Sequence, residues 1–241
     1  NSPEEIRLAL EQSLSDDFTP TLAIVFISIK PDRKAVSTML DKMGIDVIGA
    51  TSAGEFTDGH QSEGASVIML LDIPKEEYSI FFETIGDGSS EVTARQLGEV
   101  ALRQFNHPAI IFCSTFLSAE GIALDGETLM RNIENVVGSQ VNIFGGMAGD
   151  DLSFTGSYVF TNNDATDYGL VALIVDADKV AMQGMAISGW KPMGISRTIT
   201  KSEGNLIYTI DDKPALETYM RFLGGDLSTA DDNFNFFDSI V

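Results

Sequence analysis

The chain of 241 residues is long enough for one large domain or two domains of ordinary size. Its 36 acidic and 15 basic residues give a net charge of −21, which argues against nucleic acids and anionic membranes as partners, because both would be repelled. With 44% hydrophobic residues, one cysteine and no apolar run of the roughly 18–20 residues that span a bilayer, we expect a globular, cytoplasmic protein without disulfides or membrane insertion.

The first half of the chain alternates helical and extended patterns. Ser2 is a suitable N-cap for a first helix, in which Ile6 and Leu10 recur at helical spacing. The run "TLAIVFISI" is continuously apolar and rich in β-branched residues, which is typical of a strand buried on both faces. The elements predicted in this half are helices at 3–15 and 32–43, and strands at 21–29, 45–49, 64–73 and 78–85.

The second half repeats this order. Its run "AIIFCST" (109–115) resembles "AIVFISI" (23–29) almost position for position. We expect the last two strands of each half to pair with each other, and we read "SYVFTN" as an inserted strand. The elements predicted in this half are helices at 91–105 and 125–137, and strands at 109–115, 141–145, 157–162, 168–176 and 179–188.

The repeated order predicts an α/β fold built from internally duplicated units. Each unit reads helix, strand, helix, strand, glycine motif, strand, strand, which implies mixed sheets covered by helices. We place the duplicated domain at 1–189, with halves at about 1–88 and 89–189. After residue 189 the order breaks, and 190–241 are expected to begin a second module. The elements predicted in that module are strands at 195–201 and 205–211 and a helix at 213–223.

Two related glycine motifs follow corresponding strands of the two halves. They read "VIGATSAGEF" (47–56) and "NIFGGMAGDD" (142–151), and Gly54 and Gly149 occupy equivalent places. One interpretation is a tight turn in which glycine adopts a positive φ. The other is a ligand cradle made of backbone N–H groups, hydroxyls and a carboxylate. Because the motif occurs twice at equivalent places, both interpretations stay open, and the two loops are expected to face one cleft.

These motifs resemble the signatures of the FIST family, the "F-box and intracellular signal transduction" sensory domain. "IGATSAGEF" is similar to the first signature and "FGGMAGDD" to the second, while "SGWKPMG" and "GNLIYTIDDKPALETYMRFLG" resemble the start of the C-terminal portion. Ala50 departs from the pattern, because many members carry cysteine there. The resemblance implies a small-molecule-sensing domain of a signal-transduction protein, without catalysis. It also implies an output partner such as a histidine kinase, a chemoreceptor or a cyclic-nucleotide module.

The resemblance implies an amino acid or a related small polar metabolite as ligand. Glu55 and Asp150 would pair with its ammonium group, although each acid could instead hold its own loop. Ser114, at the end of a predicted strand, and Trp190, as a stacking aromatic, are further candidates. The candidate ligand-binding residues are Thr51, Ser52, Gly54, Glu55, Ser114, Gly145, Gly146, Met147, Gly149, Asp150 and Trp190.

Two other functions remain as alternatives. A small-molecule hydrolase or isomerase would use the region of Ser52 and Glu55, but no Gly-x-Ser-x-Gly nucleophile elbow occurs. A haem-based gas sensor would use His60, which follows the first motif, in preference to His107. With these two histidines and one cysteine scattered in the sequence, we expect no metal site, and no cofactor is required by the favoured function.

Overall fold

The computed structural model describes residues 2–15, 17–86, 88–185, 191–192, 194–204 and 206–223. The chain divides into two compact units, Asn1–Met185 and Ala186–Val241. The first unit contains both glycine motifs and therefore the candidate site. Among the described residues, no helix combines the length and the apolar character needed to cross a membrane.

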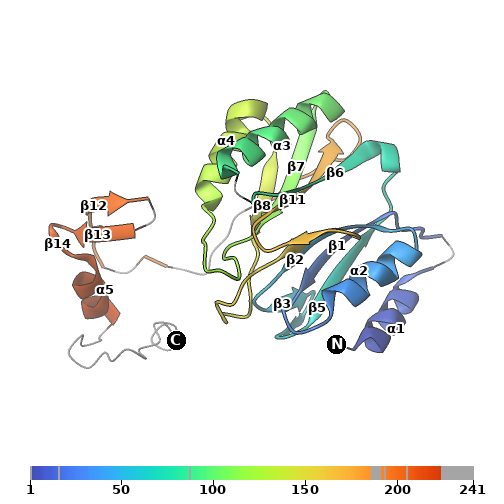
Figure 1. The fold of residues 1–241 in the computed structure, drawn as a ribbon, viewed down its shortest axis with the longest axis horizontal. Coiled ribbons are helices and arrows are strands. Elements are labelled where there is room, and N and C mark those ends of the chain that lie inside the picture. Colours follow the sequence, from blue (N-terminus) through green and yellow to red (C-terminus); the bar gives the residue numbers. More distant parts are fainter. Residues whose placement is uncertain are drawn as a thin grey trace. The chain divides into compact units, whose positions relative to one another are not determined.

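The first sheet has five strands in the order β10-β9-β2-β1-β5, of which β2, β1 and β5 are labelled in Figure 1. β1 and β2 pair in parallel, with Phe26 opposite Ala50, whereas β5 pairs antiparallel with β1 and β9 pairs antiparallel with β2. The helices and strands of this part are α1 (Pro3–Ser13), β1 (Leu22–Ile27), α2 (Arg33–Lys42), β2 (Asp46–Thr51), β5 (Ser66–Leu71), β9 (Val159–Phe160) and β10 (Ala165–Thr166).

The second sheet has four strands in the order β6-β11-β7-β8. β7 and β8 pair in parallel, with Cys113 opposite Gly146, and β11 lies antiparallel between β6 and β7. A small hairpin of β3 (Glu55–Thr57) and β4 (His60–Ser62) forms a separate two-stranded sheet. The elements of the second part are η1 (Lys75–Glu77), β6 (Tyr78–Thr84), α3 (Ser90–Gln104), β7 (Pro108–Ser114), α4 (Gly126–Val137), β8 (Ile143–Met147) and β11 (Gly169–Asp176).

The two sheets pack face to face, and each carries a pair of helices on its outer face (Figure 1). Side chains of alternating strand residues point to opposite faces. Ile48 and Ala50 of β2 therefore pack against Cys113 and Val171 of the second sheet, while Val47 packs under the helices α1 and α2. The outer face of the second sheet is covered in the same way by α3 and α4. The predicted mixed α/β fold with helix-covered sheets is confirmed.

The helix starts follow the capping signals in the sequence. Ser2 Oγ accepts a hydrogen bond from the N–H of Glu5 at 3.3 Å, and the Glu5 carboxylate accepts one from the N–H of Ser2 at 2.9 Å. At the start of α2, Asp32 accepts from the N–H of Ala35 at 3.1 Å. These contacts satisfy backbone donors that have no partner inside the helix.

One predicted strand pairing is wrong. β5 pairs with β1 and β6 pairs with β11, so β5 and β6 belong to different sheets. The connection between them, residues 72–77, contains Pro74 and a 3₁₀ turn and is longer than the usual hairpin loop, so it carries the chain across to the second sheet. The strand predicted at 179–188 is also wrong for its described part, because residues 179–185 form no strand, and residues 186–188 lie outside the described residues.

The two sheets nevertheless share one arrangement. In each sheet a parallel strand pair is flanked by a third, antiparallel strand, namely β2-β1-β5 in the first and β8-β7-β11 in the second. In each case a helix joins the two parallel strands, as a crossover connection requires. An internal duplication of the chain stays a prediction.

The described residues of the second unit form a three-stranded antiparallel sheet and one helix. Asp211 accepts hydrogen bonds from Arg197 Nη1 at 2.7 Å and from the N–H of Thr198 at 2.9 Å. The predicted two strands and helix are confirmed in type, and the start of a separate module at residue 190 stays a prediction. The elements of this unit are β12 (Ile199–Glu203), β13 (Leu206–Ile210), β14 (Lys213–Pro214) and α5 (Ala215–Leu223).

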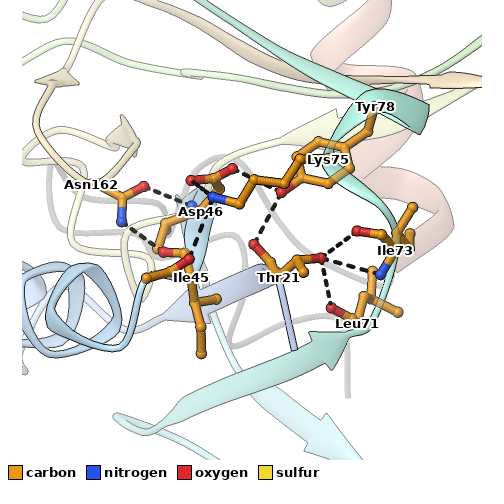
Figure 2. A network of polar contacts seen from close by, with 10 residues as sticks. Thr21, Ile45, Asp46, Leu71, Ile73, Lys75, Tyr78 and Asn162 are labelled. Carbon is orange, nitrogen blue, oxygen red and sulfur yellow. Dashed lines mark hydrogen bonds and ion pairs between the residues drawn. The ribbon is translucent and has the colours of Figure 1, made fainter. Parts of the chain in front are cut away.

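A network of polar contacts joins the two sheets where β1 and β2 begin (Figure 2). The hydroxyl of Tyr78, the first residue of β6, lies 2.8 Å from Asp46 Oδ2 and 3.0 Å from the carbonyl oxygen of Thr21. Lys75 Nζ lies 3.1 Å from Asp46 Oδ1. We call Thr21, Asp46, Lys75, Tyr78 and Asn162 the amino-end network.

Asn162, which follows β9, connects the inserted segment to the same region. Its Oδ1 accepts from the N–H of Val47 at 2.8 Å, and its Nδ2 donates to the carbonyl oxygen of Ile45 at 2.8 Å (Figure 2). Thr21 Oγ1 accepts from the N–H of Ile73 at 3.1 Å and so holds the connection that leads to β6. Side-chain hydrogen bonds therefore fix this end of the sheets.

Candidate functional site

The two glycine motifs meet at one cavity of about 460 Å³. Residues of both motifs contribute to its wall, together with residues of β1 and β7. The lining consists of Phe26, Ala50, Thr51, Ser52, Ala53, Ile111, Cys113, Gly145, Gly146, Met147, Ala148 and Gly149. Segments separated by about 95 positions in the sequence thus come together as the repeated motifs predict.

The cavity lies at the carboxyl ends of the parallel strands. Phe26 is near the end of β1, Thr51 ends β2, Cys113 is the last but one residue of β7, and Met147 ends β8. In α/β proteins, ligands commonly bind at this edge of a parallel strand pair. The cavity therefore lies where α/β proteins commonly bind ligands, and the ends of two parallel strand pairs contribute to it.

Glycine is needed where the two motifs touch. The N–H of Gly149 donates to the carbonyl oxygen of Thr51 at 2.8 Å, and a Cβ placed on Gly149 would lie 2.9 Å from the nitrogen of Ala53. A Cβ on Gly145 would lie 1.9 Å from the carbonyl oxygen of Phe112, and the φ of Gly145 is +153°. Close backbone approach therefore accounts for two of the motif glycines.

Thr51 ties the first motif to the inserted segment. Its N–H donates to the carbonyl oxygen of Tyr158 at 2.8 Å, and its Oγ1 accepts from the N–H of Tyr158 at 2.8 Å. The residue is only 1% exposed. These two bonds fix the orientation of Thr51 beside the cavity.

Glu55 is buried and bound within its own loop. Its Oε1 accepts from Ser52 Oγ at 2.7 Å, and its Oε2 accepts from the N–H of Ala65 at 2.9 Å. The residue is 2% exposed and does not line the cavity, whereas its partner Ser52 does. Gly54, with a φ of +97°, allows the chain to turn between them. A direct role of Glu55 in ligand binding stays a prediction.

Asp150 has a corresponding position in the second motif. Its Oδ2 accepts from the N–H of Thr155 at 2.8 Å, from the N–H of Gly156 at 3.2 Å and from Ser153 Oγ at 3.2 Å. The carboxylate thus organises the loop that follows, and it does not line the cavity. Contact of Asp150 with a ligand likewise stays a prediction.

The loop after the second motif is held by the neighbouring acid as well. Asp151 Oδ2 accepts from Ser28 Oγ at 2.6 Å and lies 3.7 Å from Lys30 Nζ. Asp151, Leu152 and Phe154 all have φ values between +53° and +59°, a region that non-glycine residues rarely occupy. Ser28 follows β1 directly, so this contact attaches the second motif to the first sheet.

Strand alternation separates Ser114 from the cavity. Cys113 packs between the sheets and lines the cavity, whereas Ser114 does not belong to the lining and lies at the next position along the strand. Ser114 is fully buried, and its Oγ has no hydrogen-bond partner among the described residues. Burial raises the pKa of the Cys113 thiol to about 11, so the thiol is neutral at physiological pH.

Several lining residues were not among the predicted site residues. Phe26, Ile111 and Cys113 come from strands predicted as buried, and their apolar character gave no sign of a ligand site. The alternation of side chains along a strand could have identified two of them. Ile111 and Cys113 are two positions apart in β7, so they must lie on the same face of the sheet. Trp190 lies outside the described residues.

The histidines lie away from the cavity. His60 is exposed on β4, and His107 Nδ1 lies 2.8 Å from Asp178 Oδ2. Neither histidine lines the cavity, so the residues that form it offer no histidine as an axial ligand to haem. In the part of the chain that the structure describes, histidine, cysteine and acidic residues form no group of three or more that could hold a metal ion.

Comparison with known proteins supports the family resemblance of the two glycine motifs. The chain is similar to the "Uncharacterized protein MJ1623" of Methanocaldococcus jannaschii, with 24% identity over 212 residues. The similar region covers 83% of this chain but 40% of that protein, so the chain spans less than half the length of this relative. The family model of the FIST N domain matches residues 21–213, which include both glycine motifs, and the chain therefore belongs to the FIST family of sensory domains.

Proposed function

We propose that the first unit is the ligand-binding part of a cytoplasmic signal-transduction protein and that the cavity between the glycine motifs receives a small molecule. The observation that carries this proposal is the convergence of both motifs on one cavity at the carboxyl ends of two parallel strand pairs. Its volume of about 460 Å³ lies within the range of small-molecule sites. FIST domains are sensory domains of signalling proteins, which supports binding in preference to catalysis.

A ligand in this cavity would contact both sheets at once. The contact between Gly149 and Thr51 joins the two motifs, and Asp151 attaches the second motif to Ser28. A ligand that binds one arrangement of the motifs better than another shifts the population toward it. We propose that an output partner, such as a histidine kinase, a chemoreceptor or a cyclic-nucleotide module, responds to this shift.

Catalysis by Ser52 has little support from the geometry. Ser52 Oγ donates to Glu55, but Glu55 is also held by the N–H of Ala65. Neither histidine lies at the cavity to act as a general base. We therefore propose binding without turnover.

An amino acid, the ligand that the family resemblance implies, remains the first ligand class to test. Its ammonium group would need an acceptor, and Glu55 or Asp150 would have to leave the loop contacts described above.

The test is a thermal-shift panel of amino acids and related metabolites on the wild-type chain and on an Ala50→Leu variant. Ala50 lines the cavity and is 2% exposed, so leucine fills the space that a ligand would occupy. Ala177→Leu, at an exposed alanine beyond β11, is the matched control. A ligand of the cavity should raise the melting temperature of the wild type and of the control but not of Ala50→Leu. Equal shifts in all three proteins would refute the proposed site.

A further inference from the structure

The wall of the cavity carries no charged side chain among the residues that the structure describes. Two acids of the motifs, Glu55 and Asp150, accept two and three hydrogen bonds within their own loops. Phe26 and Met147 lie at the exposed mouth of the cavity, and Ala50 and Cys113 lie at its buried inner end. A charged ligand group at the inner end would lose its hydration without gaining an ionic partner, which is costly. The cavity is therefore suited to an uncharged molecule.

The two hydroxyl groups of the wall, those of Ser52 and Thr51, both donate hydrogen bonds to other groups of the protein. Ser52 Oγ donates to Glu55 Oε1 at 2.7 Å, and Thr51 Oγ1 donates to the carbonyl oxygen of Tyr158 at 3.4 Å. A hydroxyl has one proton to donate but two lone pairs that can accept. Thr51 Oγ1 also accepts from the N–H of Tyr158. Of these two hydroxyl oxygens, Ser52 Oγ therefore has the greater remaining capacity to accept a hydrogen bond from a ligand.

Glu55 makes Ser52 a better acceptor. A hydroxyl that donates to a carboxylate is polarised, and hydrogen bonds in such a chain strengthen one another. The carboxylate is held in place by the N–H of Ala65, so its orientation toward Ser52 is fixed. Glu55 would act as a positioning residue behind Ser52, without contact to the ligand.

The rest of the wall is apolar and polarisable. Phe26 and Ile111 supply ring and aliphatic surface from the two facing sheets, and Cys113 and Met147 supply sulfur. Sulfur atoms make favourable contacts with aromatic rings. Glycine and alanine form most of the remaining wall, so the space between the sheets stays open to a flat ring.

We propose that the cavity selects uncharged, largely apolar ligands that carry one hydrogen-bond donor, of the phenol or indole kind, and that Ser52 Oγ accepts this donor. The proposal rests on the proposed function and names the ligand class of the same site. For an amino acid we would expect its ammonium group to pair with a carboxylate. In this proposal the ligand instead donates one hydrogen bond to the oxygen of Ser52.

Three probes of related shape test the proposal in a thermal-shift and calorimetric titration. Indole has the ring and the N–H donor, benzofuran has the ring without a donor, and tryptophan has the ring with two charged groups. Indole should bind, benzofuran should bind about tenfold more weakly for the loss of one hydrogen bond, and tryptophan should give no shift.

Variants separate the roles of the wall. Ser52→Ala should remove the preference for indole over benzofuran while it leaves benzofuran binding unchanged. Ala50→Leu should abolish binding of both probes, and Ala177→Leu should bind both as the wild type does. A preference for indole that persists in Ser52→Ala would overturn the assignment of Ser52.

Cys113 gives a second measurement that does not depend on melting. It is the only cysteine of the chain and lines the cavity, so its modification reports on access to this space. At mildly alkaline pH, uncharged methyl methanethiosulfonate should modify Cys113 faster than its sulfonatoethyl and trimethylammonioethyl analogues, and indole should slow the reaction. Equal rates for the three reagents would contradict exclusion of charge.

The experiments distinguish failure of the proposed ligand class from failure of the proposed function. If tryptophan or another amino acid binds and Ala50→Leu abolishes that binding, the ligand class is wrong and the proposed function stands. If indole stabilises wild type and Ala50→Leu equally and does not protect Cys113, both proposals fail.

Discussion

The two ends of the facing sheets are built in opposite ways. At the amino ends of β1 and β2, long polar side chains cross the gap between the sheets, and the Tyr78 hydroxyl lies within 3.0 Å of two acceptors (Figure 2). At the carboxyl ends, glycine and alanine predominate, and backbone meets backbone through the contact of Gly149 with Thr51. The amino end is filled by polar side chains, whereas the carboxyl end encloses a cavity, although contacts such as that of Ser28 with Asp151 hold its rim.

This difference indicates how one unit can be both stable and responsive. Side-chain hydrogen bonds in the amino-end network hold the sheets together without help from a ligand. Small residues at the other end leave space, and a ligand would supply the contacts that side chains supply elsewhere. We therefore expect glycine substitutions at the carboxyl end to alter folding or ligand binding, depending on which glycine is replaced. Substitutions at the amino end should alter stability alone.

The largest effect is expected for Gly145→Ala. Its Cβ would lie 1.9 Å from a backbone oxygen of the neighbouring strand β7, and its φ of +153° disfavours any side chain. Overpacking and backbone strain together should lower the free energy of unfolding by about 3 kcal/mol or more. Urea denaturation followed by circular dichroism measures this loss.

The adjacent glycine is the matched control. A Cβ on Gly146 would meet no described atom within 4 Å, and Gly146 is not among the positive-φ glycines. Gly146→Ala should therefore fold with nearly wild-type stability. Similar denaturation midpoints for the two variants would show that β8 and β7 lie farther apart at Gly145 in solution than in this structure.

The next largest effect is expected for Gly149→Ala. The new methyl group would lie 2.9 Å from the nitrogen of Ala53 and 3.0 Å from its Cβ, so the two motifs must separate by a few tenths of an ångström. We expect a loss of about 1–2 kcal/mol in the free energy of unfolding and weaker binding of any cavity ligand. Unchanged affinity in the presence of reduced stability would show that contact between the motifs is not part of the binding site.

The sequence was sufficient to predict the helices and most of the strands, although it did not predict the hairpin β3-β4 and wrongly predicted a strand over 179–185. Apolar periodicity and capping residues such as Ser2 and Asp32 depend on local chemistry, and the structure confirms them. The partner of β6 could not be predicted in this way, because strand pairing across sheets depends on contacts distant in sequence. The hairpin β3-β4 had a signal that was overlooked: Asp58 and Gly59 form the two-residue loop typical of tight hairpins.

The candidate site was predictable in outline only. The repeated motif located Thr51, Ser52 and Gly149 beside one cavity, whereas the apolar part of the wall looked like ordinary core. The charge of Glu55 and Asp150 favours contact with a ligand, but charge alone does not show whether backbone donors such as the N–H of Ala65 already bind the carboxylate.

At the amino end, Tyr78→Phe should cost about 1–2 kcal/mol, because it removes the hydroxyl that lies between Asp46 and Thr21. Burial, followed by the hydrogen bond to Asp46, raises the pKa of Tyr78 above its ordinary value of 10.0. The protonated form is thus favoured by folding, so this contribution is complete below pH 10 and is lost as the pH rises above it. Urea midpoints measured across this range should fall less steeply for Tyr78→Phe, and ligand affinity at neutral pH should not change.

The smallest effect is expected for His107, which precedes β7 at the amino end of the second sheet. The hydrogen bond to Asp178 raises the pKa of His107 above 6.5, so folding favours the protonated form. Its contribution is complete below pH 6.5 and is lost as the pH rises through the raised pKa. Because both side chains are exposed, the effect should be small and should fade with added salt. In His107→Gln the fall in urea midpoint between mildly acidic and mildly alkaline pH should be shallower than in the wild type. If it matched the loss expected for Tyr78→Phe, an exposed ion pair within the second sheet would stabilise the fold as much as the Tyr78 hydroxyl does, and burial would not explain the stability of the amino end.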